Sequence, residues 1–167
     1  MVMVMVIRNS NDTIKSYDNG KKSYKQYNLN GINYRILVSG EQTSGKYSII
    51  EGIFPSGEET EIPMHVRSRE NVIVYVIEGK FLFRYDQEDI NGHEGVVLKF
   101  EKNIPLSYKK VDDNEGKLLL LYTPAGFENF FKDLERLNVS NFKMFSGGDP
   151  ILLQLLQNNY GWRFVFE

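Results

Sequence analysis

The sequence predicts an all-β fold, a sandwich or barrel of antiparallel strands followed by one or two helices. Short apolar runs recur from Ile32 onward, turn residues separate them, and no helical period lies between them. Aromatic residues make up 13% of the chain, and its 11 phenylalanines and 10 tyrosines favour strands. With 167 residues, the chain has the length of one domain with its own core.

Residues 31–125 are expected to form the barrel. Six apolar runs in this range have the length and composition of strands: 32–39, 46–54, 72–77, 80–85, 96–100 and 118–122. Turn signals, for example Glu78-Gly79, separate them. The run VIVYVI, residues 72–77, has no polar alternation, which predicts a strand that is buried on both faces.

Residues 1–30 are expected to form an N-terminal arm. Its first seven residues, MVMVMVI, are apolar and β-prone, and an edge strand that is paired within a dimer is one way to cover them. This run lacks the longer apolar core, the basic leader and the cleavage site of a signal peptide. Residues 8–30 are polar without a sustained period, and we interpret them as irregular.

Residues 126–167 are expected to form a helical appendage that packs on the barrel. Apolar residues at steps of three and four predict one amphipathic helix with the face Phe127, Phe130, Phe131, Leu134 and Leu137. Asp149 as N-cap and Pro150 at the first helical position predict a second helix, which ends at Tyr160-Gly161. The last residues, WRFVFE, alternate like a strand.

The composition excludes several classes of function. The absence of cysteine excludes disulfides, thiolate metal sites and cysteine nucleophiles. A net charge of -2 and the lack of a basic stripe argue against binding to nucleic acid or to an anionic membrane. No apolar stretch approaches the roughly 20 residues that span a bilayer. We therefore expect a cytoplasmic protein without nucleic-acid or membrane partners.

One segment resembles a known motif. The sequence HVRSRENVIVYVIEG, residues 65–79, resembles the first conserved motif of the cupin family, which runs His, any residue, His, three or four residues, Glu, six residues, Gly. His65 and Gly79 stand at the first and last positions of that motif. The similarity extends from Tyr34 to Phe131 and is to the single-domain cupins described as quercetin-dioxygenase-like.

The resemblance implies a jelly-roll barrel with an interior pocket, and a homodimer formed through the outer sheet. In the family, two histidines and a glutamate of the first motif and a histidine of the second hold one metal. The matching positions here are His65, Arg67, Val72 and, counted from Gly95, Leu106. Arginine offers no lone pair, and valine and leucine have no donor atom. We therefore expect no cofactor; a divalent transition metal at a displaced site is the alternative.

His65 and Arg67 are the polar candidates for a ligand site. Strand alternation places them on one face, which in the family points into the barrel. A buried guanidinium requires either an internal carboxylate or a ligand anion, and the sequence leaves both open. His65 is either a polar contact or general base in the pocket, or a family remnant that is hydrogen-bonded to a neighbour.

The remaining candidates are mostly apolar. Tyr108 would share the face of Leu106, which brings a phenol near Arg67. Such walls suit a small, mostly apolar molecule with an acidic end, although the same side chains could fill the barrel as ordinary core. The candidate ligand-binding residues are thus His65, Arg67, Val72, Val74, Leu106 and Tyr108.

Three functions follow from this pattern. The first is a cupin without the usual metal that binds a small anionic or phenolic molecule in the barrel. The second is a dioxygenase-like or isomerase-like enzyme with a displaced metal or none. The third is a structural dimeric barrel with no ligand. The loss of the ligands at the metal positions favours the first over the enzyme.

Overall fold

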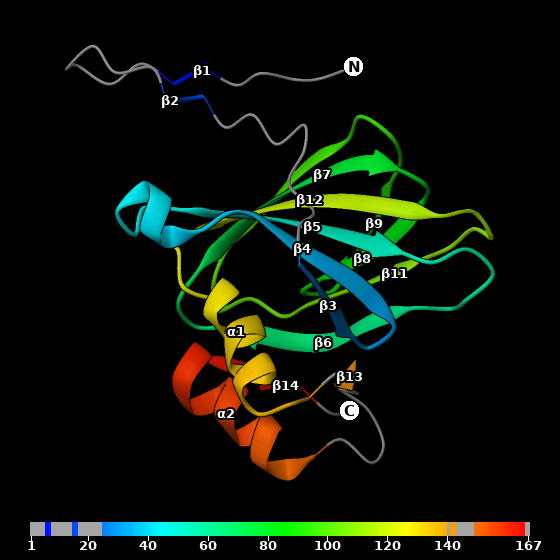
Figure 1. Ribbon diagram of the computed structural model, residues 1–167. Coiled ribbons are helices and arrows are strands. Elements are labelled where there is room, and N and C mark those ends of the chain that lie inside the picture. Colours follow the sequence, from blue (N-terminus) through cyan, green and yellow to red (C-terminus); the bar gives the residue numbers. More distant parts are fainter. Residues whose placement is uncertain (1–5, 8–14, 17–24, 140, 143–148, 166–167) are drawn as a thin grey trace.

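The computed structural model describes residues 6–7, 15–16, 25–139, 141–142 and 149–165, and two large sheets enclose one core within them (Figure 1). The first sheet contains, from edge to edge, β10 (Val97–Phe100), β7 (Asn71–Glu78), β12 (Gly116–Thr123), β5 (Ser48–Phe54), β4 (Ile32–Val38), β3 (Gln26–Leu29) and β13 (Asn141–Phe142). The second contains β14 (Trp162–Phe164), β6 (Glu61–Arg67), β11 (Leu106–Lys110), β8 (Phe81–Tyr85) and β9 (Glu88–Gly92). A separate pair joins β1 (Val6–Ile7) to β2 (Lys15–Ser16).

The chain order defines the architecture. From β5 to β8 successive strands alternate between the two sheets, and β10, β11 and β12 alternate again. Among the described strands, all pairs are antiparallel except β13 with β3. Antiparallel strands that cross repeatedly between two sheets form a jelly roll. The all-β prediction is therefore confirmed.

Both predicted helices are present beside the barrel (Figure 1). The first, α1 (Glu128–Arg136), buries Phe130, Phe131 and Leu134, as the apolar stripe predicted. The prediction is wrong for Leu137, which is 53% exposed because the helix ends at Arg136. The second, α2 (Pro150–Tyr160), begins where the Asp149 carboxylate accepts a hydrogen bond of 2.8 Å from the backbone N–H of Ile151. The side chains of both helices join the same core as the barrel strands. Neither described helix is long and apolar enough to span a membrane.

The expectation for residues 72–77 is wrong on one face. Val72, Val74 and Val76 are buried, but Ile73 and Tyr75 expose 36% and 40% of their surface. The reason is that β7 lies inside a single sheet, so its side chains alternate between the core and the exposed outer face. An apolar run therefore does not require two covered faces. The outward apolar residues are unexplained by the fold of one chain.

The N-terminal arm contains more structure than its composition predicted. Residues 26–29, inside the range interpreted as irregular, form β3 and pair with β4. Of the apolar segment 1–7, only β1 lies within the described residues, so the prediction of an edge strand for Met1–Met5 falls outside them. The boundaries after residues 30 and 125 stay predictions.

Candidate functional site

All six predicted site residues lie inside the barrel. His65 and Arg67 come from β6, Leu106 and Tyr108 from β11, and Val72 and Val74 from β7 of the opposite sheet. Each exposes 4% of its surface or less. The registers bring Leu106 opposite His65 and Phe100 opposite Val72. The alternation of the strands thus places the predicted set on the interior face of both sheets.

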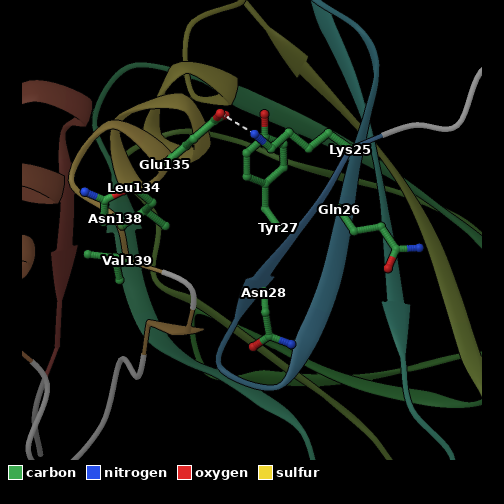
Figure 2. A pocket seen from close by; sticks show the side chains of 8 residues that line it. All are labelled: Lys25, Gln26, Tyr27, Asn28, Leu134, Glu135, Asn138 and Val139. Carbon is green, nitrogen blue, oxygen red and sulfur yellow. Dashed lines mark ion pairs between the residues drawn. The ribbon is translucent and has the colours of Figure 1, made fainter.

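Aromatic rings fill most of the interior around this set. Tyr108 lies 5.8 Å from Phe83 and 6.3 Å from Phe54 between ring centroids, and Phe83 lies 5.4 Å from Phe100. Four well-formed cavities of the described residues are lined by other side chains than the six. One of them lies between β3 and the end of α1, where Lys25 pairs with Glu135 (Figure 2). The predicted set is therefore buried and packed among aromatic rings.

Arg67 is the buried cation among the side chains whose polar atoms lack a hydrogen-bond partner within the described residues. Its side chain is 1% exposed, and neither Nη1 nor Nη2 has a hydrogen-bond partner among the described residues. No described carboxylate forms an ion pair with it. Burial lowers the pKa of the Arg67 guanidinium, and the nearby Tyr122, Tyr108 and Glu70 oppose that shift. An isolated buried cation costs several kcal/mol, roughly, because nothing replaces its hydration.

Buried tyrosines lie near this cation: Tyr122 and Tyr108 act on it directly, and Tyr34 contacts Tyr108. Burial raises the pKa of Tyr34, Tyr108 and Tyr122, so each phenol stays neutral. Tyr34 and Tyr108 are hydrogen-bonded to each other through their hydroxyl groups. Tyr122 lies opposite Val72 in the sheet register. The guanidinium therefore faces polar hydroxyls that carry no charge, and these cannot neutralise it.

Glu70 is the second unsatisfied ionisable group. It follows Arg67 in the turn between β6 and β7, is 3% exposed, and its Oε2 has no partner among the described residues. Burial raises the pKa of Glu70 to about 7, although Arg67 and Arg69 lower it. Glu70 also lines a cavity of about 310 Å³ with Gly126 and Asn159. Strongly shifted groups that line a cavity are typical of functional sites.

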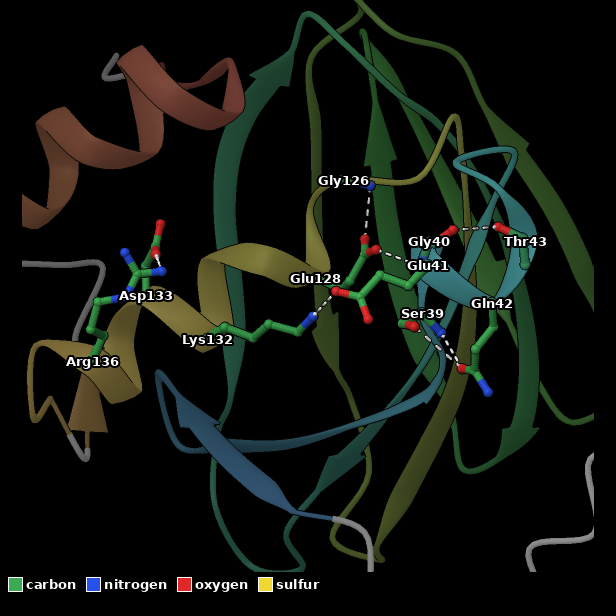
Figure 3. Close-up of polar contacts among 10 residues, drawn as sticks. All are labelled: Ser39, Gly40, Glu41, Gln42, Thr43, Gly126, Glu128, Lys132, Asp133 and Arg136. Atoms are coloured by element: carbon green, nitrogen blue, oxygen red, sulfur yellow. Dashed lines mark hydrogen bonds and ion pairs between the residues drawn. The ribbon is translucent and has the colours of Figure 1, made fainter.

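Glu128, by contrast, is a buried carboxylate with complete hydrogen bonding. Its Oε1 accepts from the Gly40 N–H at 2.7 Å and its Oε2 from the Gly126 N–H at 2.8 Å (Figure 3). It thereby ties the start of α1 to the 3-10 turn η1 (Gly40–Thr43) and to the loop after β12. Its role is structural. The protein thus gives the buried carboxylate of Glu128 two hydrogen bonds, whereas Oε2 of Glu70 has no partner among the described residues.

His65 is held by neighbours rather than presented to a ligand. Its ring stacks on Trp162 with 4.3 Å between centroids, and Trp162 stacks on Phe127 at the same distance. Burial and Arg67 lower the pKa of His65 to about 3, so the ring is neutral, and Nδ1 donates to the carbonyl oxygen of Pro63 at 2.8 Å. A ring with such a low pKa binds almost no proton at pH 7.

The donor set does not fit the metal that the cupin motif implies. The three other ligand positions carry Arg67, Val72 and Leu106, which provide no lone pair for a cation. Within the part of the chain that the structure describes, no group of three or more histidine, aspartate or glutamate side chains is arranged to hold a metal. The site therefore offers chemistry based on a cation, an acid and phenols.

Comparison with solved structures defines the fold. The chain is similar to KdgF from Halomonas sp. (TM-score 0.55, 15% identity, 66% of this chain and 94% of that chain). It is also similar to the cupin domain of Cnp3 from Schizosaccharomyces pombe (TM-score 0.55, 12% identity, 84% and 96%) and to an RmlC-like cupin from Shewanella frigidimarina (TM-score 0.53, 16% identity, 64% and 89%). The protein thus has the cupin fold.

No family model and no curated protein matches the sequence. Other cupins of similar structure are described as a nucleoside dehydratase, a sugar phosphate isomerase and a polyketide cyclase. Because one fold carries such different activities, the function of this chain has to be argued from its own residues.

Sequence reasoning missed three members of the site. Tyr122 ends the run LLLLY, and its alternation with Leu118 and Leu120 could have placed it inside the barrel. Glu70 lies at a turn position, which gives no reason to expect burial. Trp162 had no signal for its contact with His65, because the pairing of β14 with β6 joins residues far apart in the chain.

Proposed function

We propose that the protein binds a small organic anion, a carboxylate with an apolar or phenolic body, and that Arg67 holds its anionic end. The observation that carries this proposal is a fully buried guanidinium whose two terminal nitrogens have no partner among the described residues. A carboxylate pairs with both nitrogens of such a group at once. The resemblance of the motif to quercetin-dioxygenase-like cupins supports a ligand site inside the barrel. We do not extend it to the metal chemistry of that group.

The surroundings of Arg67 define the body of the ligand. Val72, Val74 and Leu106 supply apolar contacts, and Tyr108 supplies a phenolic hydroxyl that can bond a polar substituent. Because these side chains are buried and packed, the ligand enters only when they move apart. Binding then relieves the free-energy cost of the unpaired cation, which favours the opened, ligand-bound state.

The test is a ligand screen with matched variants. Thermal shifts and calorimetry would be measured with 4-hydroxybenzoate, benzoate, succinate and inorganic phosphate. We expect the aromatic carboxylates to stabilise the protein, and Arg67→Met to weaken their binding at least tenfold, or about 1.4 kcal/mol. Arg84→Met, which removes an exposed guanidinium on β8, serves as the control and should bind normally. Equal binding by wild type and Arg67→Met would reject Arg67 as the anchor.

A second proposal, a homodimer, rests on the outer face of the seven-stranded sheet. Tyr75 and Val97 are directly opposite each other in the register of β7 and β10, and Val97 is 61% exposed. Together with Ile73 they form an apolar strip, the β7–β10 strip, on the outside of the barrel. We propose that a second copy of the chain covers this strip, since exposed apolar patches commonly mark association surfaces.

A further inference from the structure

Glu70 points to the second functional group of the ligand. Arg67 and Glu70 stand three residues apart at the two ends of one turn, both are buried, and each shifts the pKa of the other. They nevertheless form no ion pair with each other. Two opposite buried charges that do not pair with each other can each be compensated by a molecule that carries the complement of each.

Apart from Arg67, the charged neighbours that act on Glu70 have other partners or the same charge. Arg69 donates from both terminal nitrogens to the backbone carbonyl oxygens of Asn158 and Asn159. Glu128, which also acts on Glu70, has the same charge and is already satisfied by backbone N–H groups. A partner for the Glu70 carboxylate therefore has to come from outside the described part of the chain.

The cavity beside Glu70 gives such a partner access. Its volume of about 310 Å³ lies at the lower end of the range for small-molecule pockets. A Cβ placed on Gly126, which lines the cavity, would be 4.0 Å from Glu70 Oε1, so this oxygen lies on the Gly126 side. The other oxygen, Oε2, is buried without a partner. One oxygen of the carboxylate therefore lies on the side of Gly126, which lines the cavity, and the other is buried without a partner among the described residues.

We propose that the ligand is a zwitterion, an amino acid whose carboxylate pairs with Arg67 and whose ammonium group pairs with Glu70, and that it enters through the cavity lined by Glu70, Gly126 and Asn159. This inference rests on the proposed function, since it adds an ammonium group to the anion that Arg67 holds. A simple carboxylate satisfies Arg67 only, and it brings a second negative charge toward Glu70.

The two ligand classes differ in how their binding depends on pH. The charged groups that act on Glu70 are Arg67, Arg69 and Glu128, and the pKa of Glu70 lies at about 7. From pH 6 to pH 8 its ionised fraction rises about tenfold, whereas amino groups stay protonated. Amino acids should therefore bind about tenfold more tightly at pH 8 than at pH 6. Simple carboxylates should bind more weakly at pH 8.

The experiment is calorimetry of the full chain at pH 6 and pH 8. The probes are glycine, β-alanine, 4-aminobutyrate and 5-aminopentanoate, which differ in the distance between the ammonium and carboxylate groups. Each is compared with the carboxylate of equal chain length that lacks the amino group. Glu70→Gln should remove the pH dependence and the preference for amino acids, while carboxylates still bind. Glu88→Gln, an exposed acid on β9, is the control for lost charge.

The outcomes separate the two proposals. If carboxylates bind through Arg67 but amino acids gain no affinity at pH 8, the zwitterion is rejected and the anion site stands. If wild type binds neither class at either pH, both proposals are rejected. The pH comparison on wild type alone decides the question even where Glu70→Gln does not fold.

Discussion

At the scale of single residues, two buried ionisable groups, Arg67 and Glu70, have terminal atoms without a partner in the part of the chain that the structure describes. By the resemblance to the cupin motif, Arg67 stands at a position that holds a metal ligand in that family, and Glu70 stands in the turn that follows it. A histidine that coordinates a metal is neutral, whereas Arg67 brings a positive charge to the matching position. The structure retains this charge at a cost in stability, which is common where a group serves binding rather than folding.

The free-energy cost of burying the Arg67 cation predicts how its removal changes the stability of the protein. Arg67→Met keeps an apolar stem and deletes the unpaired cation, so we expect the free energy of unfolding to rise by about 1–3 kcal/mol in urea titrations without ligand. Arg84→Met should change it by less than about 0.5 kcal/mol. A loss of about 3–5 kcal/mol for Arg67→Met would mean that an internal acid pairs with Arg67 after all.

Glu70 predicts how stability depends on pH. Its pKa is about 7 in the folded protein, above the ordinary value of 4.5, so the folded state binds this proton more tightly than the unfolded state. Stability from this group is therefore full below pH 4.5 and decreases by roughly 2–3 kcal/mol as the pH rises to 7. The difference in unfolding free energy between wild type and Glu70→Gln, measured from pH 4.5 to pH 8, should show this decline; a constant difference would contradict it.

At the scale of elements, the 3-10 turn η1 and the start of α1 are joined at the end of the barrel that contains Glu70. Gly40 donates its N–H to Glu128 at the start of α1, and a Cβ at this glycine would come within 2.7 Å of the Ala125 Cβ and 2.8 Å of Glu128 Oε1. Residue 40 therefore has to lack a side chain. The loop that contains Ala125 and Gly126 is positioned by this contact.

Gly40→Ala tests that junction. The added methyl group has to displace Ala125 or Glu128, and we expect a loss of about 1–3 kcal/mol in unfolding free energy. Glu41→Ala, in the same turn but with an exposed side chain, should stay within about 0.5 kcal/mol of wild type. Wild-type stability of Gly40→Ala, measured in urea, would show that the loop adapts freely.

The elements were predictable where local chemistry defines them. Asp149, Pro150 and Gly161 predicted the limits of α2 because caps act within a few residues. The strand β9 (Glu88–Gly92) was missed because its residues are mostly polar and exposed, and only pairing with β8 makes it a strand. The interior position of Arg67 followed from alternation, whereas its lack of an acid partner depends on contacts between distant segments that no local pattern encodes.

At the scale of the whole molecule, the barrel has a charged, closed interior and an apolar outer face. The residues Ile73, Tyr75 and Val97 of the β7–β10 strip are exposed, although Val72, Val74 and Val76, which alternate with the first two along β7, are buried. The cupin fold explains the inner face of the sheet, since that face encloses the core. The fold does not explain the exposed apolar residues of the outer face, which we propose are covered by a second copy of the chain.

The proposed dimer is tested by molar mass in solution. We expect twice the chain mass of 19.4 kDa by light scattering, and the monomer mass for the double variant Tyr75→Lys and Val97→Lys, because two buried charges per copy oppose association. A control with Lys80→Glu, away from the strip, should stay dimeric. A wild-type monomer at high concentration would reject the proposal.

The central claim is that an organic carboxylate pairs with Arg67 inside the barrel, and side-chain NMR tests it most directly. Arg67 Nε–Hε would be assigned by comparing wild type with Arg67→Met, and 4-hydroxybenzoate would then be added. We predict a saturable shift of this resonance, while the Arg84 resonance stays in place. An Arg67 resonance that remains unchanged as the ligand binds, or binding of equal affinity to Arg67→Met, would contradict the account.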